Sequence, residues 1–230
     1  MARGMKVALV GALLVAAAAA AAYFGHESYQ RQVALAKVVP IVRQVSVRLS
    51  ESLALERAPG VTFKELFDRM ERYVGATDDK ILELRTMDAS RISEEHQFVL
   101  RYAELAQAAW RSKSAVYQTM LSAQSSHKWA MERMSEFTGS SGYGRDLNHR
   151  MAAKAVTDAR EAVLKFDIAQ IEHVSALRAL QETLKSPPQA LALSDLANVD
   201  NLKAAADAVV KEEVTKRQLS LLDTYERMLR

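Results

Sequence analysis

The stretch ISEEHQFVLRYAELAQAAWRSKSAVYQTMLSAQSSHKWAMERM, residues 92–134, decides the fold class of this chain. It contains neither glycine nor proline, and it is rich in Ala, Leu, Glu, Gln and Arg, which lose little conformational freedom in a helix. One set of its residues recurs at spacings of alternately four and three, which is the heptad pattern of helices that pair along a left-handed seam. We call this set the heptad seam: Ile92, His96, Val99, Ala103, Ala106, Trp110, Lys113, Tyr117, Met120, Gln124, His127, Met131 and Met134. The stretch therefore predicts a long helix that packs along another helix.

Glycine and proline divide the rest of the chain into further helical stretches. Residues 76–138, 145–186 and 189–230 contain neither residue, and turns are expected at Gly139–Gly144 and at Pro187-Pro188. A first helix is expected over about residues 27–57. A second, short helix begins with the capping box Thr62-Phe63-Lys64-Glu65 and is expected to end at Gly75, with Thr77 capping the next helix.

Residues 145–185 carry two apolar stripes at helical spacing. The first is Val156, Ala159, Val163 and Phe166, and the second is Ile171, Val174, Leu177, Leu180 and Leu184. A last helix is expected over residues 194–229, and no segment shows the alternation of a strand. The fold class is thus all-α, an antiparallel bundle of about four long helices plus one short helix, preceded by an N-terminal apolar helix.

The N-terminal segment, residues 1–25, predicts either a signal anchor or a signal peptide, followed by a helical bundle domain over residues 26–230. Arg3 and Lys6 precede 19 uncharged residues, Val7–Gly25. As an anchor, residues 7–24 cross the inner membrane once, with Tyr23 and Phe24 at the interface and the C-terminal domain in the periplasm. As a signal peptide, the segment is cleaved near Ala20-Ala21-Ala22 and leaves a soluble periplasmic protein. Both interpretations stay open.

Composition excludes several classes of protein. Hydrophobic residues make up 49% of the chain and charged residues 26%, which is typical of a folded protein. The net charge of +3 comes from the first 60 residues, because residues 61–230 hold 24 Lys and Arg against 25 Asp and Glu. This distribution gives no basic face for nucleic acid. The absence of cysteine excludes disulfides, thiol catalysis, thiolate metal sites and a lipoprotein anchor.

Motifs for catalysis, metal or cofactors are weak. Asp146 and His149 have the spacing of two ligands on one helical face, but a di-metal bundle needs a second such motif, and none occurs. The chain has no G-x-S-x-G nucleophile motif, and Gly139–Gly144 lacks the Gly-Lys-Ser/Thr ending of a phosphate-binding loop. We therefore expect no catalytic residue, no metal and no cofactor, and a protein that is not an enzyme.

Trp110, Lys113 and Tyr117 are the candidate partner-binding residues. They lie three and four residues apart on the heptad seam, so both rings share the face of the Lys113 ammonium. A buried unpaired ammonium costs several kcal/mol. Its stem can therefore run along the rings with the charge in water, or it pairs with a carboxylate such as Asp167 or Glu213. Otherwise the seam is uncovered here, and the three residues form a docking surface.

Two functions follow from these patterns. The first is a structural or adaptor protein of the envelope that binds other envelope proteins, or a second copy of itself through the heptad seam. The second is a periplasmic bundle that binds a small molecule. This layout resembles the four-helix periplasmic bundle of bacterial chemoreceptors, although no motif is shared. Since the chain ends at Arg230 without a second apolar segment, such a sensor is expected to pass its signal to a partner protein.

Lys113→Met separates the structural and docking interpretations, because it keeps the stem and removes the charge. On the structural interpretation, partner binding is unchanged and stability shifts by about 1–3 kcal/mol in either direction. On the docking interpretation, melting is unchanged and partner capture in a pull-down falls at least about tenfold, or about 1.4 kcal/mol.

Overall fold

The structure is a computed structural model that describes residues 2–55, 59–191, 198–211 and 214–230, with side chains for residues 22–55, 59–191, 198–209 and 215–230. All regular structure in these residues is helical, and they contain no strand, which confirms the predicted all-α class. The elements are α1 (Ala2–Leu55), α2 (Phe63–Thr86), α3 (Ser93–Thr138), α4 (Gly144–Leu184), the short 3₁₀ turn η1 (Gln189–Leu191), α5 (Val199–Lys211) and α6 (Val214–Leu229).

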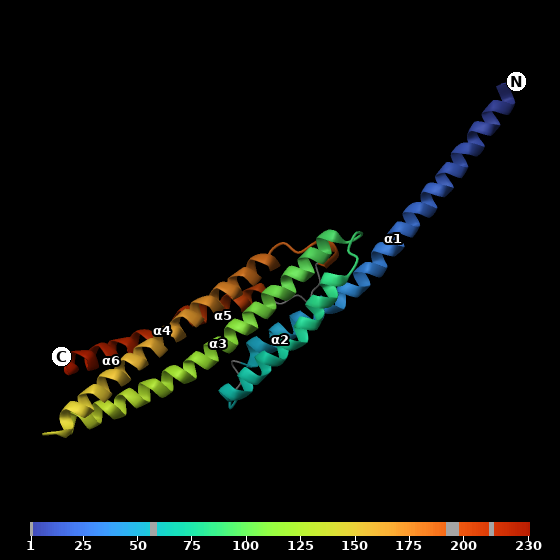
Figure 1. The fold of residues 1–230 in the computed structure, drawn as a ribbon. Helices are drawn as coiled ribbons and strands as arrows, with labels where there is room; N and C mark the ends of the chain where they lie inside the picture. The colour runs from blue at the N-terminus through green and yellow to red at the C-terminus, as the bar shows by residue number, and fades with distance from the viewer. Residues whose placement is uncertain (1, 56–58, 192–197, 212–213) are drawn as a thin grey trace.

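A long antiparallel hairpin of α3 and α4 forms the spine of the bundle (Figure 1). The second half of α1 and the whole of α2 lie along the first half of α3, and α5 and α6 lie along α4. The first half of α1 projects from the bundle as a single straight helix (Figure 1). The loop at residues 139–143 reverses the chain as predicted, and Gly142 adopts a φ of +66°, a conformation that glycine reaches without strain.

Two hydrophobic cores lie along the hairpin. The proximal core, nearer the projecting part of α1, takes residues from five helices: Leu49 (α1), Met70 (α2), Trp110 (α3), Leu180 (α4) and Leu202 (α5). The distal core takes residues from three helices: Ala130 and Phe137 (α3), Ala159 and Phe166 (α4) and Leu222 (α6). Among the described residues, five helices therefore surround the proximal half of the bundle and three surround its distal half.

The predicted end of the second helix at Gly75 is wrong. The capping box at its start is present, since Thr62 Oγ1 accepts from Glu65 N at 3.3 Å and Thr62 N donates to Glu65 Oε2 at 2.8 Å. The helix then continues through Gly75 to Thr86, because burial of residues on both sides of this glycine outweighs its cost of about 1 kcal/mol in a helix. The chain breaks at residues 87–92, which contain neither glycine nor proline. There the Asp88 carboxylate accepts from Ser90 N at 3.0 Å and stabilises a local turn.

The heptad seam is confirmed for residues 92–117, which are buried at these positions except for half-buried His96. Farther along α3 the seam is confirmed at Met134, which is buried, and Met120 and His127 are half-buried. Gln124 and Met131 are exposed, and the residues before them, Ala123 and Ala130, are buried instead. The neighbours of α3 change along its length, because α1 and α2 contribute to the proximal core and α6 contributes to the distal core, so the buried face of α3 differs between its two halves. In the distal core these small residues meet further alanines of α4: Ala152, Ala155, Ala159 and Ala162.

The C-terminal residues form two described helices, α5 and α6, where the sequence predicted one. Residues 192–197, where that helix was expected to begin, and residues 212–213, between α5 and α6, lie outside the described part of the chain. On α4, the second predicted stripe is buried except at Ile171, which faces solvent.

Among residues 22–55, 59–191, 198–209 and 215–230, whose side chains the structure describes, no helix is long and apolar enough to cross a membrane. The structure describes no side chain of residues 1–21, which form most of the predicted anchor or signal peptide (residues 1–25). This segment therefore stays a prediction.

We expect Ala130→Leu to lower the free energy of unfolding by about 1–3 kcal/mol, because an overpacked core forces side chains off their preferred rotamers. Ala130 is fully buried in the distal core, whereas its neighbour Met131 is 48% exposed. Met131→Leu is therefore the matched control, with an expected change within about 0.5 kcal/mol. Urea unfolding followed by circular dichroism measures both. Unchanged stability of Ala130→Leu would contradict the close packing of α3 in this core.

Candidate functional site

The three candidate partner-binding residues lie in the middle of the proximal core. Trp110, Lys113 and Tyr117 are 2%, 8% and 5% exposed. A small hollow lined by Ser52 and Leu53 of α1, Met70 of α2, Lys113 of α3 and His173 of α4 marks the point where four helices meet. A partner therefore reaches these residues only after a helix of the bundle moves, and their role in partner binding stays a prediction.

The polar atoms of this region join neighbouring helices. The Trp110 indole donates to Ser52 Oγ at 3.2 Å, and Ser52 Oγ donates to the Leu49 carbonyl at 2.8 Å, which connects α3 to α1. The Lys113 ammonium lies 5.2 Å from the centre of the Tyr117 ring, within the range of a cation–π contact. Of the two carboxylates expected to pair with Lys113, Asp167 lines a different hollow on α4, and Glu213 lies outside the described residues.

His173 is a buried neutral histidine beside this cluster. Its Nδ1 lies 3.0 Å from Ser112 Oγ, which connects α4 to α3. Burial, with a smaller contribution from the Lys113 charge, lowers the pKa of His173 from 6.5 to about 3. An imidazole with this pKa stays neutral near pH 7 and is a poor general acid or base there.

Two other histidines form hydrogen bonds to carbonyl groups near the ends of neighbouring helices. His96 Nε2 donates to the Leu84 carbonyl at 2.7 Å near the end of α2, and His149 Nε2 donates to the Leu229 carbonyl at 2.7 Å at the end of α6. His149 therefore contacts α6, while Asp146 lines an open hollow at the distal tip. Within the part of the chain that the structure describes, no three His, Asp or Glu side chains lie close enough together to hold a metal ion.

Two ion pairs join α1 to the end of the bundle from which it projects. Arg31 pairs with the buried Glu95 carboxylate at 2.5 Å, and Glu27 lies 3.9 Å from Arg91 in the α2–α3 loop. Burial acts to raise the pKa of Glu95, but its hydrogen bonds to Arg31 and the backbone, together with the Arg31 charge, outweigh burial and leave the pKa below its usual value. Sequence analysis missed these pairs. The adjacent acids Glu94 and Glu95 at the start of α3 were the available signal, but their partner lies 64 residues earlier.

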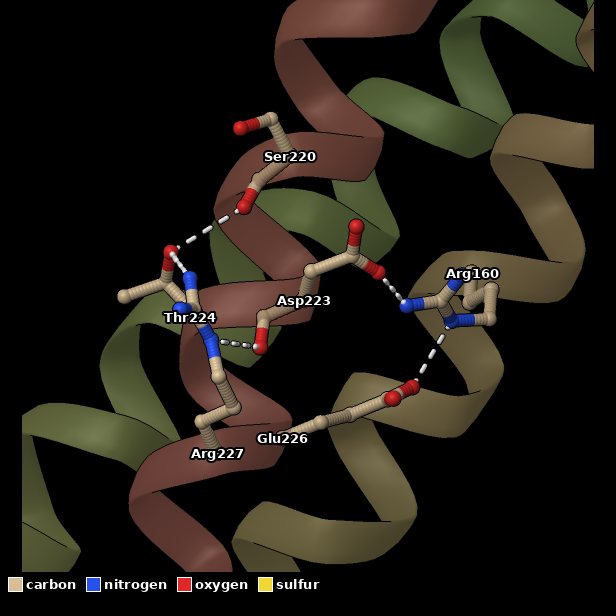
Figure 2. A network of polar contacts seen from close by, with 6 residues as sticks. All are labelled: Arg160, Ser220, Asp223, Thr224, Glu226 and Arg227. Atoms are coloured by element: carbon tan, nitrogen blue, oxygen red, sulfur yellow. Dashed lines mark hydrogen bonds and ion pairs between the residues drawn. The ribbon is translucent and has the colours of Figure 1, made fainter.

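A second set of charges holds α6 against α4 (Figure 2). The Arg160 guanidinium donates to the carboxylate of Asp223 and, from Nε at 2.7 Å, to Glu226. On the far side of α6, Arg227 bonds to the Asp223 carbonyl and to Thr224, within its own helix (Figure 2). The hydrogen bond to Asp223, with that to Glu226, raises the pKa of Arg160, so this side chain stays charged. Sequence analysis did not identify this clamp, because charged residues 63 and 66 positions apart carry no local pattern.

The described residues thus form an all-α bundle in which several buried or half-buried polar side chains join one helix to another. No family model matches the chain, and no curated protein or solved structure matches it.

His173→Gln tests the buried neutral histidine. The unfolded chain takes up a proton at His173 below a pH of about 6.5, whereas the folded chain does so only near pH 3, so folding stability falls as the pH drops through this window. We expect the wild-type protein to lose about 2 kcal/mol more than His173→Gln between pH 7 and pH 5. Urea unfolding at both pH values measures this difference.

The control is His26→Gln, because His26 is exposed on the projecting part of α1. This variant should keep the pH dependence of the wild-type protein. If wild type and His173→Gln lost stability equally between the two pH values, the assignment of a neutral buried His173 would be wrong.

Proposed function

We propose that this chain is a non-enzymatic, membrane-anchored helical bundle of the cell envelope that binds partner proteins. The observation that carries the proposal is α1, a single helix with the uncharged residues 7–25 at one end and the proximal-core residues Val38, Val42, Val45 and Leu49 at the other. A bundle whose first helix continues without a break into an apolar segment is well suited to display on a membrane.

The polar contacts support a structural role. Trp110, His96, His149, His173 and Arg160 each bond across to another helix. Such contacts contribute to the arrangement of helices. Of the three histidines among these residues, His173 is the one whose ring lies beside a hydroxyl, that of Ser112, and its lowered pKa makes this ring a poor base near pH 7.

An exposed apolar stripe on α4 supports partner binding. Leu164, Ile168 and Ile171 are 45%, 56% and 62% exposed, and their spacing of four and three places them on one face of the helix. Exposed apolar residues at this spacing suit a partner helix. We therefore place the partner on this face.

The second candidate function is a small-molecule sensor in the periplasm. A hollow of about 540 Å³ between α4 and the α5–α6 region, lined by Val174, Val209, Asp167 and Arg178, favours it. Ligand sites usually bury most of their ligand, whereas this hollow is open and its Ile171 is largely exposed. We therefore prefer partner binding to small-molecule sensing as the proposed function.

Affinity purification of the tagged full-length protein from carbonate-washed membranes tests both parts of the proposal. Val15→Arg puts a charge near the middle of the apolar segment, at a cost of about 2.5–3.5 kcal/mol. It should move the protein to the soluble fraction, whereas Val15→Leu should leave it in the membrane. A soluble wild-type product that begins near Tyr23 would instead support export and cleavage.

In the same membranes, Ile168→Glu should reduce partner capture at least about tenfold. Its melting temperature should change little, because Ile168 is exposed. Thr157→Ser, a conservative change on an exposed part of the same helix, is the control and should keep the partner. Full capture by Ile168→Glu would rule out this face as the binding surface.

A further inference from the structure

Three segments meet at the end of the bundle from which α1 projects (Figure 1). Ser28, Arg31 and Gln32 of α1, Glu94 and Glu95 of α3, and residues 188–190 line one hollow of about 550 Å³. The α2–α3 loop lies at the same level, since its Arg91 approaches Glu27 of α1. We call this end, formed by residues 87–92 and 185–191 beside α1, the proximal surface.

Three exposed aromatic residues of α1 lie near the proximal surface: Tyr23 and Phe24 just beyond it, and Tyr29 at its level, between Ser28 and Arg31. Tyr23, Phe24 and Tyr29 are 64%, 67% and 62% exposed. Successive residues of an α-helix point about 100° apart, so these rings face three different sides of α1. A protein neighbour would cover one side, whereas the interface of a lipid bilayer surrounds a helix completely. Aromatic rings with a polar edge concentrate at that interface.

The rise of the helix sets the distance between these rings and the bundle. At about 1.5 Å per residue, Glu27 and Arg31 lie roughly 5 and 10 Å farther along α1 than Phe24. The headgroup layer on each side of a bilayer is roughly 5–8 Å thick. If Tyr23 and Phe24 lie at the edge of the hydrocarbon, the proximal surface lies at the outer part of the headgroup layer.

We propose that the proximal surface is a membrane-contact surface that rests on phospholipid headgroups. This inference depends on the proposed function through the uncleaved anchor. The polar lining from Ser28, Gln32 and Gln189 suits a hydrated headgroup layer. The pairs Arg31–Glu95 and Glu27–Arg91 join this end of the bundle to α1, so the bundle follows the direction of its anchor.

Single spin labels test this contact, because the chain has no cysteine and each introduced thiol is unique. Ser90→Cys and Ser186→Cys place labels on the exposed proximal surface, and Ser141→Cys places one on the exposed distal loop. The distal loop lies beyond the far end of α3, whose 46 residues span about 70 Å. Ala12→Cys places a label within the apolar segment. Each full-length variant is reconstituted into phosphatidylcholine vesicles with and without a nickel-chelating lipid.

Nickel on the lipid headgroups should broaden the electron paramagnetic resonance signal of the labels at residues 90 and 186. It should leave the signal of the label at residue 141 unchanged. If residue 12 is shielded in the hydrocarbon but residues 90 and 186 respond no more than residue 141, the contact is refuted and the anchor stands. If the label at residue 12 is open to a water-soluble relaxation agent, the anchor itself is refuted. A strong response at residue 141 also overturns the inference, because the bundle would then lie flat on the bilayer.

Discussion

The close approach of α3 and α4 is the constraint on which the rest of the bundle depends. In its distal half the two helices contribute buried alanines to one core, and small side chains allow two backbones to come near each other. Once this hairpin is formed, its two sides offer separate surfaces, with α1 and α2 against α3 and with α5 and α6 against α4. The distal core therefore needs only α6 to close it, while the wider proximal core needs α1, α2 and α5.

Buried hydroxyls and rings then determine how α1 sits against the hairpin. Ser46 shares a hydrogen bond of 2.9 Å with the Tyr102 hydroxyl, and Ser52 accepts from Trp110 farther along the same two helices. A shift of α1 by one residue would separate both pairs and leave buried polar atoms without these bonds, at about 1–3 kcal/mol for each group. Apolar packing alone tolerates such a slip more easily, so these bonds fix the register of α1.

Sequence analysis predicted the features that depend on local chemistry. The capping box at Thr62 and the turn at Gly139–Gly144 follow from side chains within a few residues, and both are present. The break at residues 87–92 was missed because an Asp–Ser turn replaces glycine there, and Gly75 was misjudged because tertiary packing holds it in the helix.

Contacts between distant residues were beyond the same reasoning. Periodicity placed Lys113 on an apolar face correctly but did not identify the helices that cover it. The Arg160 clamp and the Arg31–Glu95 pair join residues about 60 positions apart, and nothing in the local sequence connects such residues. Long-range pairing is decided by the packing of whole helices, which a single sequence does not display.

The placement of α1 in the proximal core also sets an order of events during synthesis. Its apolar stripe leaves the ribosome first, yet Ser52 meets Trp110 only 58 residues later, and the same core awaits Leu177 and Leu180 of α4. At translation rates of about 5–20 residues per second, that interval is on the order of ten seconds. During most of it, Val38, Val42, Val45 and Leu49 have α2 as a native neighbour but lack α3 and α4, which complete the proximal core. The apolar stripe of α1 therefore stays partly exposed until the α3–α4 hairpin has been synthesised.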